Sequence, residues 1–446
     1  MGGTHMNFKK TAAIAAAVGA LGAVSVPAFA LENEFKGMYR AYGYYTNALS
    51  GAGGFNLKDS ATDKFIEQRA RLMYTAKASA DLKLVTHFEL DTKFGGSTNA
   101  KYANAGAAGS DAGGLDADRV TLETKNVYID FNCPLTGSKV LVGIVPFSDA
   151  YQGTWGNFDT TALVVSKKFG AFTGTYVYAA AAQADLTGST FNSDRNTLDV
   201  NILDGRFAVS KDLTLGANYY NVLGPNSTNY QMNMLGLNAA GKFGPAALTA
   251  SFGYQFGNQD IARNVDINAF GGAVAAKIDA GPGKVNLSFL YLSGDNGVLV
   301  NKDKGWQVAS AGTTYFTPAN MWLITRNAAT INSSTAIGGS SDLTRGGRGI
   351  MGFFAGYEGA ADKLYYNANV GYAQVDEKRT AASDEIGTEI NATVGYKLYP
   401  ALSISATAAY AFLGDGYGKS TGTLLPGGVA NADDPFLTNV ALNFSF

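Results

Sequence analysis

The sequence predicts an all-β fold: one transmembrane antiparallel β-barrel of about 18 strands, with 16 or 20 strands as alternatives. Three observations lead to this prediction. Apolar and polar residues alternate in segment after segment, the connections between segments are alternately short and long, and the chain ends in a strand with an aromatic face. Alternation with short turns on one side and long loops on the other is typical of barrels that cross an outer membrane.

The C-terminal segment, 436–446, shows the alternation most clearly. One face would carry Phe436, Thr438, Val440, Leu442, Phe444 and Phe446, and the other would carry Leu437, Asn439, Ala441, Asn443 and Ser445. A soluble domain rarely exposes such an edge, because an apolar edge strand promotes aggregation. We therefore expect this strand to pair with the first strand, 34–45, and so close the barrel.

The N-terminal residues have the organisation of an export signal. Residues 1–5 resemble an expression scar, and residues 6–30 read as a signal peptide with two lysines, an apolar stretch and an Ala-Phe-Ala cleavage site. The apolar stretch is too short to span a membrane. We expect cleavage before Leu31, so that residues 31–446 form a single transmembrane β-barrel.

The composition agrees with a barrel and excludes several other classes. The 446 residues include 55 Gly, 24 Tyr and 26 Phe but only 10 Pro, which suits many strands, glycine-rich loops and aromatic girdles. The formal net charge of −2 is not that of a nucleic-acid-binding protein. Cys133 is the only cysteine, so a disulfide framework and cysteine-based zinc or haem sites are excluded, and no cofactor or metal is expected.

All 18 expected strands follow the same alternation. They are expected over 34–45, 64–79, 82–94, 119–131, 139–147, 161–168, 171–183, 196–209, 212–222, 230–241, 246–257, 263–278, 284–292, 347–358, 363–376, 387–397, 401–412 and 435–446. Tight connections such as 80–81 would be periplasmic turns, and the longer ones extracellular loops. The stretch 293–346 either is one long loop, for which a flexible external position is favoured over an inward one, or contains a further hairpin.

Long charged side chains share one face of the early strands. Those on 64–79 are Glu67, Arg69, Arg71 and Lys77, and those on 82–94 are Lys83, His87, Glu89, Asp91 and Lys93. A face of this charge needs water, which predicts an aqueous lumen. In 196–209 the apolar residues change parity, which predicts a β-bulge near Asp204 and Gly205.

Four segments together resemble a known family. They read Glu-Gln-Arg-Ala-Arg-Leu at 67–72, Leu-Lys-Leu-Val-Thr-His-Phe-Glu-Leu-Asp at 82–91, Val-Tyr-Ile-Asp-Phe at 127–131 and Val-Leu-Val-Gly-Ile-Val-Pro-Phe at 140–147. They look like the N-terminal third of bacterial outer-membrane porins, and are similar in particular to the phosphate-selective porin superfamily, over about residues 34–165. The resemblance implies a channel in the outer membrane of a Gram-negative bacterium. Its expected partners are outer-membrane lipids and small hydrophilic solutes or ions, in a homotrimer.

The same resemblance places a constriction. In porins a loop after the fifth strand folds into the lumen, and here it would be 148–161. Its residues would be Asp149, Tyr151 and Asp159, and the facing wall would carry Arg40, Arg69, Arg71 and Lys83 together with Glu67 and Glu89. An acidic loop opposite a basic wall would set a transverse field that selects solutes by charge. The alternative is that the arginines simply pair with Glu67 or Glu89 and that the aspartates are solvated.

The function expected from these features is passive diffusion of small hydrophilic solutes or ions. An anion-preferring uptake porin and a structural sleeve around an electron-transfer chain stay open as alternatives. An enzyme is not expected, because outer-membrane lipases and proteases need a histidine beside a serine or an acid. His87 is the only histidine beyond the N-terminal scar, and its predicted position is on the lumenal face.

Overall fold

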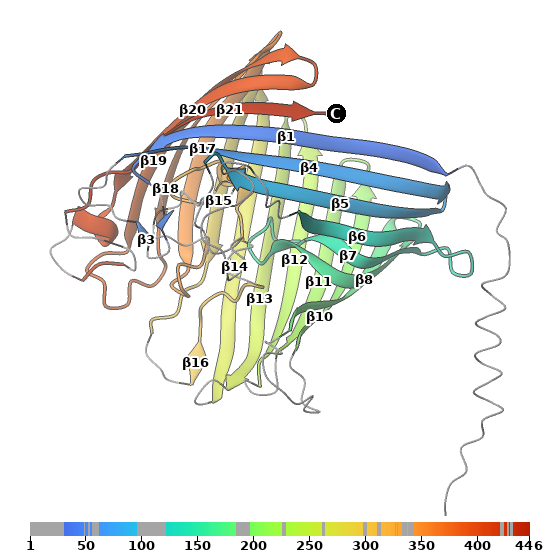
Figure 1. Cartoon of the computed structure of the whole chain (residues 1–446). Coiled ribbons are helices and arrows are strands. Elements are labelled where there is room, and N and C mark those ends of the chain that lie inside the picture. Colours follow the sequence, from blue (N-terminus) through green and yellow to red (C-terminus); the bar gives the residue numbers. More distant parts are fainter. Residues whose placement is uncertain are drawn as a thin grey trace, which may run out of the picture.

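The computed structural model describes residues 31–48, 50–51, 54–55, 62–95, 122–183, 197–224, 229–260, 264–297, 301–309, 314–325, 327, 329–331, 337, 343–419, 423–425, 428 and 431–446. Within them, 18 long antiparallel strands form one closed barrel (Figure 1). The predicted fold and strand number are therefore confirmed. The expected scar and signal peptide lie outside the described residues.

The strand boundaries lie close to the predicted ones. The barrel strands are β1 (Glu32–Thr46), β4 (Asp63–Ser79), β5 (Leu82–Lys93), β6 (Glu123–Asn132), β7 (Lys139–Ser148), β8 (Asn157–Phe169), β9 (Phe172–Gln183), β10 (Thr197–Ser210), β11 (Leu213–Leu223), β12 (Gln231–Phe243), β13 (Ala246–Asp260), β14 (Asn264–Ala280), β15 (Gly283–Leu292), β17 (Ile350–Ala361), β18 (Leu364–Gln374), β19 (Glu385–Tyr399), β20 (Leu402–Leu413) and β21 (Phe436–Ser445). Short strands β2 (Ser50–Gly51) and β3 (Gly54–Phe55) pair with each other, and β16 (Lys302–Asp303) pairs with β14.

The C-terminal strand is the seam of the barrel, as predicted. β21 pairs with β20 on one side and with β1 on the other, where Ala41 lies opposite Leu442. Beyond the last β21 residue, Gly37 and Phe446 exchange two backbone hydrogen bonds of 3.0 Å. Both ends of the described barrel lie at the end that carries the short turns, because β1 begins beside the end of β4 (Figure 1). Closure removes the free sheet edges that lipid cannot satisfy.

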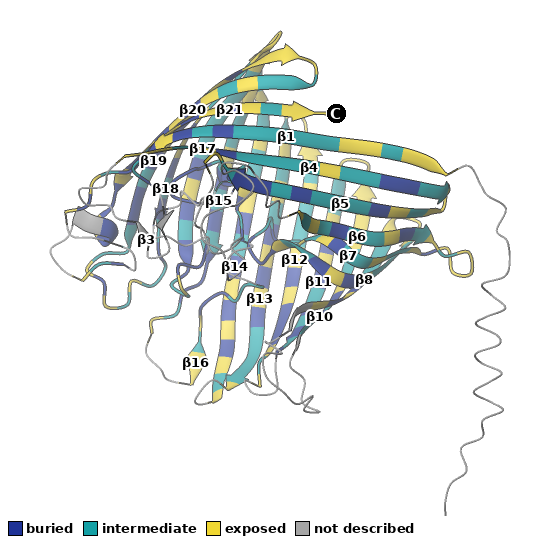
Figure 2. Cartoon of the chain, viewed as in Figure 1, coloured by how far each residue is buried: buried dark blue, intermediate teal, exposed yellow. Residues whose placement is uncertain are grey.

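The two faces of the barrel differ as the alternation predicts. In β20, Ile404, Tyr410 and Phe412 are exposed, whereas Ala409 and Ala411 between them are buried. Figure 2 shows this banding along many strands. An outer face of exposed apolar side chains suits lipid, and the inner face is covered by other parts of the chain.

No helix among the described residues has the length and apolar character needed to span a membrane.

The bulge predicted in β10 is wrong. Residues 199–207 keep an unbroken register with β9, and shifts occur only near the strand ends, at Leu198 and between Ala208 and Ser210. The change of parity has another cause: Val200 and Ile202 face inward, into an apolar cluster, while Leu203 is exposed to the outside. Part of the lumen is therefore apolar here, although the lumen-facing residues of such a barrel are expected to be polar.

The connection from β15 to β17 folds into the barrel. Its described residues include Trp306, Phe316 and Leu323, which are buried in the same cluster as Phe354 on the inner face of β17. They contain β16 and the short 3₁₀ helix η2 (Thr317–Ala319) but no additional barrel strand. The expectation of a flexible external loop is therefore wrong for this part of the chain. The number of large apolar side chains explains the difference, because they gain most by leaving water.

Candidate functional site

One inward segment, residues 149–156, connects β7 to β8. The carboxylate of Asp149 accepts four backbone hydrogen bonds of 2.7–2.8 Å, from Tyr151, Gly153, Trp155 and Gly156. Gly153 has φ 87°, and a Cβ there would lie 2.5 Å from the carbonyl oxygen of Tyr315, so only glycine suits the turn. Burial raises the pKa of Asp149, and the four N–H donors offset part of this effect.

This segment is hydrogen-bonded to the wall formed by β11, β13 and β14. The hydroxyl of Tyr151 donates to Asn218 on β11, and Gln152 donates to Ser251 Oγ at 3.3 Å and to Ala273 O at 3.2 Å. The inward loop expected at 148–161 is therefore present but shorter, because residues 157–161 already belong to β8. Its acidic residue points into its own turn and not towards the arginines.

The charged wall on β4, β5 and β6 is internally paired. Arg69 binds both carboxylate oxygens of Asp91, with 2.6 Å between Nε and Oδ1, and Arg71 binds Glu89. Lys83 lies 3.1 Å from Asp130 on β6. This is the paired arrangement that the alternative interpretation expected, with Glu89 as one of the partners. Glu67 is fully buried on the same wall.

Asp159 also has a partner on the barrel. It lies in β8, and its carboxylate accepts hydrogen bonds of 2.6 Å from Lys125 Nζ and 2.7 Å from Asn126 Nδ2. Since Asp149 is enclosed by its own turn and Asp159 is paired with Lys125, the expected acidic face of the loop is not formed.

Arg40 differs from the other arginines of this wall. It lies on β1 directly opposite Arg69, and its Nε donates to Asn443 Oδ1 at 2.9 Å. The guanidinium lies 5.4 Å from the ring of Tyr42, and Nη1 is 3.4 Å from the carbonyl oxygen of Ala329. Within the described part of the chain no carboxylate forms an ion pair with Arg40, so its charge is available to a solute.

A second inward segment, residues 314–325, crosses the lumen near β19. The carboxylate of Glu389, fully buried on the inner face of β19, accepts hydrogen bonds of 2.8–2.9 Å from the backbone N–H groups of Trp322, Leu323 and Ile324. Arg345, further along the same connection, donates to the carbonyl oxygens of Ile324 and Ile337. Glu389 is not among the site residues predicted from the sequence. The available signal was a lone carboxylate at an inward position of the predicted strand 387–397.

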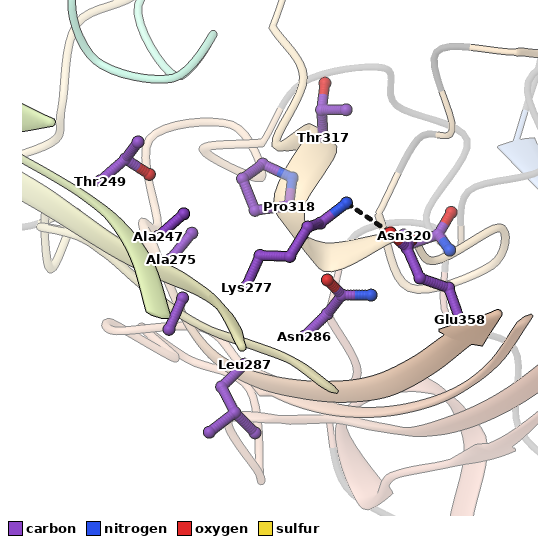
Figure 3. Close-up of a pocket in the computed structure, with 11 residues that line it drawn as sticks. Ala247, Thr249, Ala275, Lys277, Asn286, Leu287, Thr317, Pro318, Asn320 and Glu358 are labelled. Carbon is purple, nitrogen blue, oxygen red and sulfur yellow. Dashed lines mark hydrogen bonds and ion pairs between the residues drawn. The ribbon is translucent and has the colours of Figure 1, made fainter. Parts of the chain in front are cut away.

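Beneath this segment the inner wall is hollowed. A cavity of about 460 Å³ lies between the inner faces of β13, β14, β15 and β17 and the η2 turn (Figure 3). Lys277 and Glu358 form an ion pair of 2.6 Å at its edge, and Asn286 lies close to them. Among the described residues that line the cavity, the charges of Lys277 and Glu358 balance.

No metal centre is apparent in the parts of the chain that the structure describes, where no group of three His, Cys, Asp or Glu side chains is placed to bind an ion. Cys133 is a free thiol in the turn between β6 and β7.

The comparisons with known proteins rest on structure. No family model matches the chain, and no curated protein matches its sequence. The fold is similar to the outer membrane protein opdK from Pseudomonas aeruginosa, with 12% identity, coverage of 93% of this chain and 98% of that chain, and a TM-score of 0.54. OccK8 (OprE) from the same organism has 11% identity, the same coverages and a TM-score of 0.54. OccK2 (OpdF), solved in complex with glucuronate, has 12% identity, the same coverages and a TM-score of 0.52. At this level of identity the likeness establishes the barrel fold.

Proposed function

We propose that this chain is a bacterial outer-membrane porin through which small hydrophilic solutes or ions diffuse passively. The observation that carries the proposal is a closed barrel with an apolar outer face, whose lumen holds polar walls and is narrowed by residues 149–156 and 314–325. A closed barrel is one of the few structures that satisfies every backbone group in lipid. No chemical step is required: the inward segments limit solute size, and wall charges bias which ions enter.

A general channel fits the walls better than a strongly anion-selective one. A ladder for anions needs several cations without partners, but Arg69, Arg71 and Lys83 are each bound to a carboxylate. For the same reason the wall does not favour a phosphate-selective channel. The similar proteins OpdK and OccK2 were solved with vanillate and glucuronate, both small carboxylates. If a carboxylate is recognised here, Arg40 is the group that we expect to contact it.

The inward segments argue against a sleeve around another protein. Residues 306–309 and 314–325 pack against residues 149–156 and against the inner walls of β11 to β19. A separate electron carrier would have to displace this packed material, at the cost of the buried apolar surface.

Targeting and assembly complete the proposal. We infer that residues 6–30 direct export and are removed before Leu31, that the short turns face the periplasm, and that the barrel assembles as a homotrimer in the outer membrane. The charged substitution Leu442→Asp on the lipid face of the seam should prevent outer-membrane assembly. Asn443→Asp, one residue away on the inner face beside Arg40, is the matched control and should assemble normally.

Planar bilayers provide the direct test. The purified barrel should insert and give stepwise ionic currents with weak ion selectivity in a salt gradient. Purified, folded protein that inserts without conducting would contradict the channel function. Strong anion selectivity would instead favour the uptake-porin alternative.

A further inference from the structure

The cavity of Figure 3 has a fixed roof. Ser288 Oγ on β15 donates to Pro318 O at 3.2 Å, and Asn391 Nδ2 on β19 donates to Asn320 O at 3.0 Å. These bonds hold the η2 turn over the inner face of β14 and β15, which forms the floor. The cavity is thus a defined space on the proposed solute path, large enough at about 460 Å³ for a small organic molecule.

Its polar groups carry both signs of charge. Lys277 on β14 and Glu358 on β17 are bound to each other, but their side chains are 49% and 37% exposed. They are less enclosed than the paired wall arginines, so a solute can approach this ion pair. Asn286 lies between their strands, and its side-chain oxygen is buried with no hydrogen-bond partner among the described residues. A buried acceptor without a donor is costly, and a solute that brings an N–H group would satisfy it.

We propose that this cavity is a subsite for small zwitterionic solutes, of the α-amino acid type. The solute carboxylate would contact Lys277, and its ammonium group would contact Glu358 and the oxygen of Asn286. An anion would be repelled by Glu358 and a cation by Lys277. A zwitterion offers each of these two residues a group of opposite charge. A sugar is less well matched, because the described residues that line the cavity include no aromatic ring on which a sugar could stack. The inference rests on the proposed channel function and names its substrate class.

Liposome swelling tests the subsite and the channel function separately. Vesicles that contain the full mature barrel are placed in L-alanine or in glycerol, and the ratio of the two swelling rates is measured. The subsite is removed without change of net charge in Lys277→Gln/Glu358→Gln, and its acceptor is removed separately in Asn286→Ala. We expect the alanine-to-glycerol ratio to fall about threefold in the double variant, as for loss of a partly exposed charged contact.

The matched control is Glu32→Gln/Lys77→Gln. These two residues also form an ion pair, of 2.9 Å, with both side chains partly exposed, but they lie on β1 and β4 and neither lines the cavity. The ratio should stay unchanged in this variant, and glycerol rates should stay unchanged in all three, which shows that the barrels are folded.

Three results would overturn the subsite. They are an unchanged ratio in both cavity variants, an equal fall in the control, and a fall in glycerol and alanine rates together. Failure of the native barrel to admit either solute would overturn the channel function itself, and is thereby distinguished from failure of the subsite.

Discussion

The two inward segments are each held by one buried carboxylate, but from opposite directions. In residues 149–156, Asp149 belongs to the segment and binds N–H groups two to seven positions further along the chain. In residues 314–325, the N–H groups bind Glu389, which lies on β19 and 65–67 positions away. The first segment therefore carries its own anchor, and the second depends on the barrel wall.

Contacts between the segments extend this difference. Trp306, which precedes the second segment, donates from Nε1 to Thr154 O at 3.1 Å, and its ring lies 6.0 Å from that of Tyr151. Tyr315 N donates to Gly153 O at 2.9 Å. The second segment thus uses the first as a support. The two segments therefore form one constriction, in which the second segment is bound both to the first segment and to the wall.

Glu389→Ala should have the largest effect. Three buried N–H groups lose their acceptor, which costs on the order of 3 kcal/mol and should release the second segment. The expected result is a severalfold larger single-channel conductance and new protease cleavage between β15 and β17. Glu389→Gln keeps the shape and one acceptor oxygen, so an intermediate result is expected.

Glu358→Ala is the matched control for this prediction. Glu358 is also an inward-facing acid, on β17, but it is partly exposed and bound to Lys277. Its loss should leave the cleavage pattern unchanged. If Glu389→Ala behaves in the same way, the second segment does not depend on the wall.

Asp149→Ala should have a smaller effect on the pore. The turn loses four hydrogen bonds, but Trp155 and Tyr151 stay packed against Tyr220, with ring centroids 5.1 and 5.5 Å apart. We expect about 2 kcal/mol less stability, because part of the backbone can bind water instead. Conductance should rise less than in Glu389→Ala. A larger rise would reverse the order of dependence proposed here.

The pH dependence of Asp149 tests the same anchor. Burial holds the pKa of Asp149 in the folded protein above its ordinary value. The contribution of Asp149 to the free energy of unfolding is therefore greatest at a pH below the ordinary pKa, and it is lost as the pH rises through the pKa of the folded state. Acidification from about pH 7 to about pH 4 should therefore favour the folded turn at this residue. The Tm of the native protein should rise relative to the Tm of Asp149→Asn when the pH is lowered. A shift in the opposite direction would show that the four N–H donors outweigh burial.

The sequence predicts the barrel well because lipid imposes a local rule on every strand. It does not predict the charged pairs: the tight turn alone would align Arg69 with Thr92, and a register shift between Lys77 and Ser79 brings Arg69 opposite Asp91 instead. The bond from Glu389 to Trp322 follows from no local rule either, because Trp322 lies in a connection without alternation and no turn fixes its position relative to β19. The bulge predicted near Asp204 and Gly205 is wrong for a related reason, since Val200 and Ile202 face inward only because packed segments make that part of the lumen apolar.

The charged wall should affect ion selectivity without opening the pore. Asp91→Asn leaves Arg69 without this carboxylate and should favour anions, whereas Arg69→Gln should favour cations. Each change should alter the permeability ratio about twofold, as expected for a charge screened by a wet lumen. Reversal potentials in a salt gradient measure the ratio. The two substitutions serve as controls for each other, and shifts of the same sign would mean that the pair acts through structure and not through charge.

Arg40→Gln should have the smallest effect on the size of the pore, and it tests whether the long connection is held from one side or from two. Arg40 reaches Ala329 O at only 3.4 Å, a weak contact beside the three bonds to Glu389. Conductance should therefore stay within about 20% of the native value, while selectivity moves towards cations. Arg40→Lys keeps the charge and should retain the native selectivity. If Arg40→Gln instead opens the pore as widely as Glu389→Ala, the connection is suspended between β1 and β19. In that case Arg40 on β1 and Glu389 on β19 both anchor the connection. The second segment then depends on the barrel wall at two places, whereas the first segment is held by its own Asp149.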